Sequence, residues 1–236
     1  MIENDKFKAV RDFYDEAYYT EAEIERGHAT WHDHLIARRL GDLQGKRVLD
    51  VACGLGQWLQ VLHRSGALVS GIDISSRAVE QCRQRFPGAD FRVGPAETLP
   101  FDDAKFDLVT CMGSLEHFLD KPSALREMVR VAAPGAHFLI LVPNAGFMTR
   151  RLGLYGGTHQ TRIREDVYSL EQWDALLRSA GLVVEQRWRD LHTLDPGWIG
   201  KGRPWTWPLR ALQALALPLW PLSWQYQVHH YCRRAA

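Results

Sequence analysis

The sequence lacks the features that mark several classes of protein. Its formal net charge is only +1 over 236 residues, so no strong electrostatic field attracts nucleic acid. The first residues are polar and contain no apolar core of a signal peptide. We therefore expect no nucleic-acid partner and a cytoplasmic location.

Cysteine is scarce, and its arrangement excludes two further classes. The four cysteines form no Cys-x-x-Cys pair, and no histidine follows them at a spacing typical of zinc ligands. Cys53 and Cys111 lie in apolar, strand-like runs. We expect both to be buried thiols in a reducing compartment, and we predict no metal site.

What the sequence does contain is a glycine turn within residues 48–58. Apolar residues run up to Asp50, Gly54 and Gly56 follow, and helix-forming residues come next. This pattern predicts a buried strand, a tight turn and the start of a helix. Backbone amides in such a turn can bind an anionic group, because glycine has no Cβ and a helix N-terminus favours negative charge.

The second strand of the pattern ends in an acidic residue. Asp73 follows Gly56 by 17 residues, close to the separation expected of an acid that binds ribose hydroxyls. Leu59 stands where a dinucleotide-binding turn has its third glycine, which argues against a nicotinamide cofactor. A nucleoside ligand with a carboxylate and no phosphate fits better, and S-adenosylmethionine is such a ligand.

From residue 46 onward, predicted strands alternate with predicted helices, which is typical of a parallel sheet covered on both faces. The predicted helices cover 57–65, 75–86 and 121–132, and a further one begins after Ser169, which can cap it together with Gln172. The predicted strands cover 47–52, 68–73, 90–93, 106–112, 136–143, 182–188 and 226–232.

Four motifs occur in order along this region, and together they resemble those of class I S-adenosylmethionine-dependent methyltransferases. They are Asp50-x-x-x-Gly54-x-Gly56, Gly71-Ile72-Asp73-Ile74-Ser75, Ala96-Glu97-Thr98-Leu99-Pro100-Phe101 and Phe106-Asp107-Leu108-Val109-Thr110. The resemblance implies a Rossmann-like, seven-stranded, mostly parallel sheet with helices on both faces. It also implies S-adenosyl-L-methionine as cofactor, a helical cap over 1–45 and a methyltransferase domain over 46–236.

The resemblance also implies roles for individual residues. Asp50 would meet the ammonium of the donor, the turn amides its carboxylate, and Asp73 its ribose hydroxyls. Pro95 stands where the family commonly has aspartate, so one contact to the adenine amino group is expected to be missing. The implied donor-binding residues are Asp50, Ala52, Gly54, Gly56, Asp73, Ile74, Ala96, Glu97 and Met112.

The residues after the fourth strand supply the candidate general base. The string Cys-Met-x-x-Leu-Glu-His, which ends in Glu116 and His117, resembles the O-methyltransferases of ubiquinone biosynthesis. Some of those enzymes hold a divalent metal with two glutamates and the histidine, but Gly113 replaces the first glutamate here. We expect His117, assisted by Glu116, to accept a proton from the acceptor. The alternative is that the pair only starts a helix.

The acceptor side is less constrained by pattern. Amphipathic helices are predicted over 3–20 and roughly 28–42, and they either pack on the domain or form a lid over the pocket. Arginines at 150, 151, 162 and 164 form a basic group that either grips an acidic acceptor or is solvated. The candidate acceptor residues are Tyr14, Tyr18, Trp31, His159 and His192.

An insertion over 190–222 is rich in proline and tryptophan. Prolines and Arg210 interrupt its apolar stretch, which falls short of the roughly 20 residues that a membrane-spanning helix needs. The insertion can cover a hydrophobic acceptor or contact a second subunit in a homodimer. A less favoured alternative is a peripheral membrane contact through 204–224, which would make the protein membrane-associated.

These observations favour a methyltransferase that acts on a small, hydrophobic or aromatic acceptor, with methylation at oxygen. Methylation at carbon or nitrogen is the alternative within the enzyme class. A module that binds S-adenosylmethionine without turnover is the alternative outside it.

Overall fold

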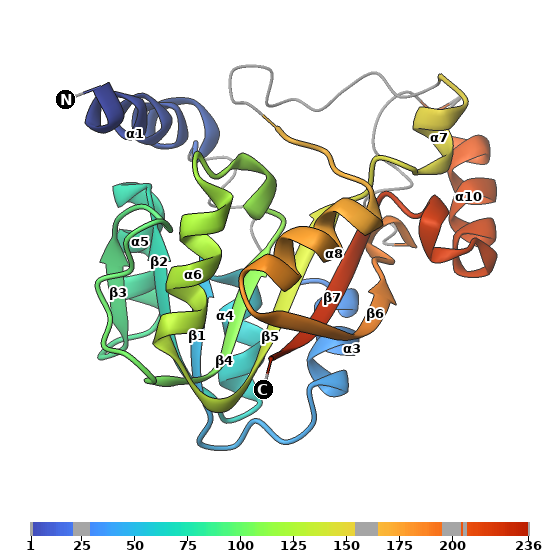
Figure 1. The fold of residues 1–236 in the computed structure, drawn as a ribbon. Helices are drawn as coiled ribbons and strands as arrows, with labels where there is room; N and C mark the ends of the chain where they lie inside the picture. Colours follow the sequence, from blue (N-terminus) through green and yellow to red (C-terminus); the bar gives the residue numbers. More distant parts are fainter. Residues whose placement is uncertain (1, 21–28, 154–164, 195–203, 205–206, 236) are drawn as a thin grey trace.

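The structure is a computed structural model that describes residues 2–20, 29–153, 165–194, 204 and 207–235. A seven-stranded sheet runs through it in the order β3-β2-β1-β4-β5-β7-β6 (Figure 1). Its strands are β1 (Arg47–Val51), β2 (Leu68–Asp73), β3 (Asp90–Val93), β4 (Phe106–Met112), β5 (Ala132–Pro143), β6 (Leu182–Arg189) and β7 (Gln227–Arg234).

Six of the strands run in the same direction, and only β7 is reversed, pairing antiparallel with both β5 and β6. The chain runs outward from β1 to β3, then returns to add β4 on the other side of β1. Ligands bind at such a reversal, beyond the carboxyl ends of the strands. The predicted seven-stranded, mostly parallel sheet is confirmed, and the reversal marks the place to look for a site.

Helices cover both faces of the sheet (Figure 1). One apolar core lies against α3 (Trp31–Arg39), α4 (Gln57–Arg64) and α5 (Ser76–Arg85). The other lies against α6 (Lys121–Val131) and α8 (Leu170–Ser179). Burial on both faces explains why the central strands are almost continuously apolar.

Local signals in the sequence account for several element ends. Ser169 Oγ accepts a hydrogen bond from Gln172 N (3.3 Å), and Gln172 Oε1 accepts one from Ser169 N (2.8 Å). This reciprocal cap starts α8 as predicted. Cys53 and Cys111 are both buried with free thiols, which confirms their predicted burial.

Two predicted boundaries are wrong. The single helix expected over 3–20 is split into α1 (Ile2–Phe13) and a π-helical turn η1 (Tyr14–Tyr18). Strand β5 begins at Ala132 rather than at 136, so its first residues include Pro134. Tertiary contacts override the local signal in both cases, because η1 is held by the start of α5 and Ala132 pairs with Phe106.

The connections after β5 and β6 gather beyond the carboxyl end of β5. They contain α7 (Met148–Arg151), η3 (His192–Leu194), α10 (Trp207–Ala216), η5 (Leu217–Leu219) and η6 (Leu222–Trp224). Among the described residues, no helix is long and apolar enough to cross a membrane.

Candidate functional site

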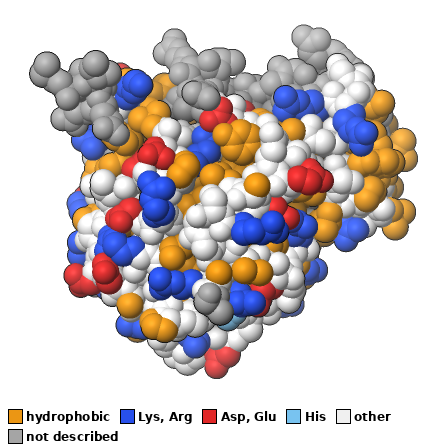
Figure 2. Space-filling view, in the orientation of Figure 1, with side chains coloured by type: hydrophobic (Ala, Val, Ile, Leu, Met, Phe, Trp, Pro, Cys, Tyr) orange, Lys and Arg blue, Asp and Glu red, His pale blue; other side chains and the backbone are white. Residues whose placement is uncertain are grey.

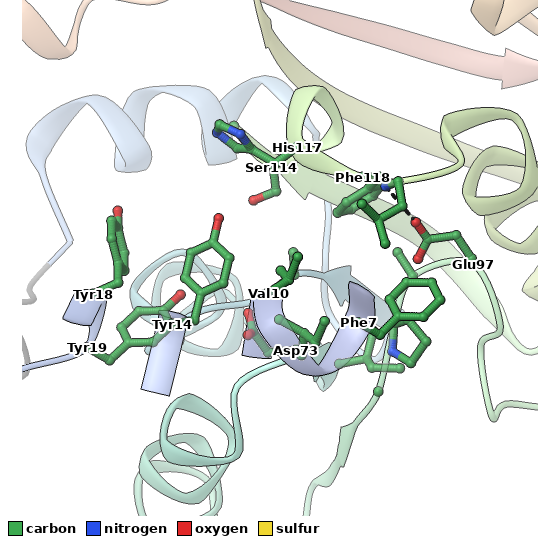
Figure 3. Close-up of a pocket in the computed structure, with 18 residues that line it drawn as sticks. Phe7, Val10, Tyr14, Tyr18, Tyr19, Asp73, Glu97, Ser114, His117 and Phe118 are labelled. Atoms are coloured by element: carbon green, nitrogen blue, oxygen red, sulfur yellow. Dashed lines mark hydrogen bonds between the residues drawn. The ribbon is translucent and has the colours of Figure 1, made fainter. Parts of the chain in front are cut away.

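A pocket opens at the carboxyl ends of β1, β2 and β4, roofed by the N-terminal segment (Figure 3). Tyr14, Tyr18 and Tyr19 lie together on one side of it, and Ser114 and His117 lie across from them. The lining residues are Phe7, Val10, Tyr14, Tyr18, Tyr19, Ala52, Ile72, Asp73, Ile74, Gly94, Pro95, Ala96, Glu97, Gly113, Ser114, His117, Phe118 and Leu119.

Asp73 is the polar centre of this pocket. Its Oδ2 accepts a hydrogen bond from Gly54 N (2.8 Å), and its Oδ1 accepts one from Ser75 N (2.9 Å). Burial raises the pKa of Asp73 to about 6, although these amide bonds favour the carboxylate. The carboxylate therefore joins the glycine turn to the start of α5, and it also lines the pocket.

Asp50 does not line the pocket. The residue is only 2% exposed, and its Oδ1 accepts a hydrogen bond from Thr110 Oγ1 (2.6 Å). Burial, together with the nearby Asp73, raises the pKa of Asp50 to about 7, although the hydrogen bond from Thr110 opposes this rise. The contact with a donor ammonium that the resemblance implies for Asp50 stays a prediction.

The two glycines of the turn have different surroundings. Both have positive φ, +52° at Gly54 and +75° at Gly56. A Cβ on Gly54 would lie 3.0 Å from the Tyr19 hydroxyl, whereas one on Gly56 would lie 3.0 Å from Cys82 Sγ. Gly54 therefore faces the pocket roof, and Gly56 allows close packing on α5.

Tyr19 is not among the predicted site residues, although it is half-buried and its hydroxyl lies against the glycine turn. Its ring centroid lies 5.0 Å from that of Tyr18, and the Tyr14 and Tyr18 centroids lie 5.3 Å apart. Burial raises the pKa of Tyr14 and Tyr19 well above the ordinary value, so both hydroxyls stay protonated. Helical spacing places Tyr18 on the apolar face, and only the break at η1 turns Tyr19 inward.

The roof is attached to the strand end that carries Asp73. The Asp15 carboxylate accepts hydrogen bonds from Ser75 Oγ (2.5 Å) and Ser76 Oγ (2.8 Å). Arg11 Nε donates to Ile74 O (3.1 Å). The N-terminal segment thus lies over the pocket, and its action as a lid stays a prediction.

Of the two predicted catalytic residues, only His117 lines the pocket. Glu116 is 3% exposed, and its Oε2 has no hydrogen-bond partner among the described residues. Burial raises the pKa of Glu116 to about 8, so its carboxyl group is largely protonated at neutral pH. The pair forms the short helix η2 (Leu115–His117), which turns the two side chains in different directions.

The loop after β3, which the resemblance assigns to adenine, forms one side of the pocket. Pro95, Ala96 and Glu97 all line it, facing Ile74 on the loop after β2. Glu97 Oε1 accepts hydrogen bonds from Leu119 N (3.0 Å) and Asp120 N (3.2 Å), the first of which is drawn in Figure 3. Met112, by contrast, does not line the pocket.

The predicted acceptor residues are separated by the fold. Tyr14 and Tyr18 line the pocket. Trp31 starts α3 with 42% of its surface exposed and does not line it. His192 lines a second hollow next to β7, and His159 lies outside the described residues.

The residues present fit an adenosyl ligand. Apolar side chains of Ile72, Ile74 and Val10 flank the Asp73 carboxylate, which matches a flat base next to a ribose with two hydroxyls. The described part of the chain holds no group of three or more His, Cys, Asp or Glu side chains placed to bind a metal ion.

Comparisons with known proteins agree with this geometry. Residues 49–140 match the family model described as a methyltransferase domain. The chain is 31% identical over 163 residues to the ubiquinone biosynthesis O-methyltransferase of Alkalilimnicola ehrlichii, covering 61% of this chain and 66% of that protein. It is 32% identical over 171 residues to the 27-O-demethylrifamycin SV methyltransferase of Amycolatopsis mediterranei, covering 65% and 60%.

The fold as a whole is shared with solved structures. A chain from the complex of the Haloferax volcanii Trm112 methyltransferase activator superimposes with a TM-score of 0.72. It is 23% identical, and the match covers 96% of this chain and 98% of that one. The likeness shows the fold alone, and the chain spans less than two thirds of either curated relative.

Proposed function

We propose that this chain, which belongs to the class I S-adenosylmethionine-dependent methyltransferases, transfers a methyl group to an oxygen of a small, hydrophobic or aromatic acceptor. One observation carries the donor half of the proposal. The Asp73 carboxylate binds the Gly54 amide and lines the pocket beside Ile74. An acid in that position accepts hydrogen bonds from ribose hydroxyls.

The residues around the pocket support transfer through alignment and exclusion of water. S-adenosylmethionine, when bound, supplies a methyl group on a positively charged sulfur. The aromatic roof of Tyr14, Tyr18 and Tyr19 shields the pocket from solvent. Well-oriented reactants can lower a barrier by about 7–11 kcal/mol, so this arrangement needs little further chemistry from the protein.

An oxygen acceptor must also lose a proton. His117 faces the pocket across from the tyrosines, and we propose it as the proton acceptor (Figure 3). A positioned base contributes about 10²–10⁴-fold to such a rate. Glu116 is neutral at pH 7 because burial raises its pKa, so its proposed part is to hold η2 in place.

Two measurements test this function. Calorimetry should detect binding of S-adenosylhomocysteine and no binding of NAD. Transfer of a labelled methyl group to a panel of phenols should then be detected with the full chain and lost in His117→Gln. Absence of heat with S-adenosylhomocysteine would overturn the proposal. Full turnover in His117→Gln would contradict only the proposed role of His117 as proton acceptor.

The alternatives are methylation at carbon or nitrogen and a module that binds the donor without turnover. Methylation of carbon would leave the label in a product that resists ether cleavage. A binding module would bind S-adenosylhomocysteine but transfer no label to any acceptor. The similar Haloferax chain was solved in a complex with a methyltransferase activator, so co-purification should also test whether this chain binds a protein partner.

We also propose a peripheral membrane contact through 204–224. Apolar side chains gather over α10 at the right edge of the molecule (Figure 2). Leu212, Leu215 and Leu219 are 64%, 76% and 84% exposed. Contiguous exposed apolar surface of this kind is typical of a contact surface for a membrane or a second subunit.

A further inference from the structure

The pocket at the carboxyl ends of β1, β2 and β4, which we call the donor pocket, has two chemically different ends. Asp73 lies between them (Figure 3). The rings of Phe7 and Phe118 lie on one side of Asp73, and the three roof tyrosines lie on the other. With the ribose at Asp73, the apolar rings suit a flat base, and the hydroxyl groups of the roof suit the polar amino-acid end of the donor.

The glycine turn uses its own amides within the protein. The resemblance implies that these amides bind the carboxylate of the donor. Gly54 N, however, donates to Asp73 Oδ2 (2.8 Å), and Gly56 N donates to Cys53 O (3.0 Å). Cys53 N donates in turn to Ile72 O (3.0 Å). Each backbone amide has one hydrogen to donate, so the carboxylate needs a hydrogen-bond donor from elsewhere in the pocket.

The described lining of the donor pocket contains no lysine or arginine, the side chains that most often bind a carboxylate. Its acidic members, Asp73 and Glu97, suit the positively charged groups of the donor instead. An anionic group is therefore left with His117, which we propose as a proton acceptor, and with hydroxyl groups. Those hydroxyl groups belong to Tyr14, Tyr18, Tyr19 and Ser114.

Among these groups, the Tyr19 hydroxyl lies against the glycine turn. A Cβ on Gly54 would lie 3.0 Å from Tyr19 Oη, and the other two atoms nearest to that position also belong to Tyr19. Burial, with Asp73 as the next cause, raises the pKa of Tyr19 well above its ordinary value, so the hydroxyl keeps its proton. Within the part of the chain that the structure describes, it donates that proton to no other group.

Neighbouring residues hold Tyr19 over the turn. Its backbone amide donates to Tyr14 O (2.9 Å), which closes η1, and its ring meets that of Tyr18 edge to face with centroids 5.0 Å apart. Asp15 fixes η1 to the start of α5 through Ser75. The hydroxyl is thus positioned before a ligand enters, which lowers the entropic cost of binding.

We propose that Tyr19 is a donor-binding residue whose hydroxyl donates a hydrogen bond to the carboxylate of S-adenosylmethionine, in place of the engaged turn amides. The proposal rests on the proposed function, because it takes S-adenosylmethionine as the ligand of the donor pocket. A hydroxyl group makes this bond without a positive charge, which would repel the sulfonium of the donor. Tyr19 belongs to the roof, so the same bond joins the roof to the donor.

Calorimetry with two ligands that differ by one carboxylate tests this contact. S-adenosylhomocysteine carries the carboxylate, and S-adenosyl-3-thiopropylamine is the same molecule with hydrogen in its place. With the full chain, Tyr19→Phe should weaken S-adenosylhomocysteine binding about 10- to 100-fold, the effect of one hydrogen bond to a charged group. The affinity for S-adenosyl-3-thiopropylamine should stay within about twofold, because the ring of the roof remains.

Tyr231→Phe is the matched control. It removes a hydroxyl from a tyrosine that stacks on Trp188 outside the donor pocket, with centroids 5.2 Å apart, and should leave both affinities unchanged. Equal weakening of the two ligands by Tyr19→Phe would overturn the proposal, since Tyr19 would then only shape the roof. Unchanged binding of S-adenosylhomocysteine in Tyr19→Phe would overturn it as well and leave the proposed function standing. A wild type that binds neither ligand would contradict the proposed function itself and this contact with it.

Discussion

Burial shifts pKa values in opposite directions on the β1–β4 side and on the β5–β7 side of the sheet. The first side carries carboxyl groups whose pKa values burial raises, to about 7 in Asp50, 6 in Asp73 and 8 in Glu116. The second side carries histidines whose pKa values burial lowers, to about 4 in His229 and His230. High pH therefore destabilises the β1–β4 side, where carboxyl groups must ionise, and low pH destabilises the β5–β7 side, where histidines must gain a proton.

The two sides also differ in how far apart their partners lie in the sequence. On the first side, Asp73 binds the turn at Gly54 that precedes it by one strand and one helix. On the second, Asp190 meets His32, and Asn144 meets Ser223. The first site depends on one βαβ unit, whereas the second depends on the whole topology.

The largest expected effect is on the first side. Asp73→Ala should weaken S-adenosylhomocysteine binding about 100-fold or more, because it removes the ribose acceptor and frees the Gly54 and Ser75 amides. Calorimetry measures this change. Asp73→Asn, which keeps one acceptor oxygen, should lose less. Equal losses in both variants would show that charge alone matters.

The next largest effect is expected in the stability of the β1–β4 side at high pH. Because the pKa of Glu116 is raised from 4.5 to about 8, folding free energy is lost as pH rises through that interval. Glu116→Gln should nearly match the wild type at pH 5 and be more stable at pH 9, by about 4 kcal/mol, since each pH unit between 5 and 8 corresponds to about 1.4 kcal/mol. Urea unfolding at both pH values checks this. Equal stability at pH 9 would contradict the assignment.

At low pH, the stability of the β5–β7 side should depend on a buried histidine. Burial lowers the pKa of His230 from 6.5 to about 4, so stability is present above pH 6.5 and lost as pH falls through this range. His230→Phe keeps a ring of similar size and should reduce the loss of stability between pH 6.5 and 4 by about 3 kcal/mol. The partly exposed His137 offers a matched control, and His137→Phe should retain the wild-type slope.

The smallest change in stability is expected on the apolar face of α10 and η5. Leu215→Gln with Leu219→Gln should alter unfolding free energy by less than about 0.5 kcal/mol, because both side chains are exposed. The pair should nonetheless reduce co-sedimentation with phosphatidylglycerol vesicles. Leu68→Gln, at another exposed leucine, is the control. Unchanged co-sedimentation would favour a subunit contact, which analytical ultracentrifugation detects.

Much of the donor pocket could be predicted from the sequence. Ala52, Asp73, Ile74, Ala96 and Glu97 all line it, because each stands at or just after the carboxyl end of a strand. In a parallel sheet those ends share one edge, so strand positions alone bring the residues together.

The roof of the pocket and the hollow next to β7 could not be found that way. Tyr19 follows η1, where the regular helical period ends, and His192 is held by Asp190, which also contacts His32 far away in the sequence. Trp31 was predicted to line the pocket and does not, because its position in a helix does not indicate which element covers α3.

The sequence by itself therefore determined the sheet, the glycine turn and the acid at the end of β2, since periodicity and turn chemistry act over a few neighbouring residues. Only the tertiary structure decided that Asp50 is buried and does not line the pocket, that burial raises the pKa of Glu116, and that Asp190 contacts both His32 and His192. Those properties depend on burial and on partners far away in the chain, and the local sequence pattern predicts neither of them.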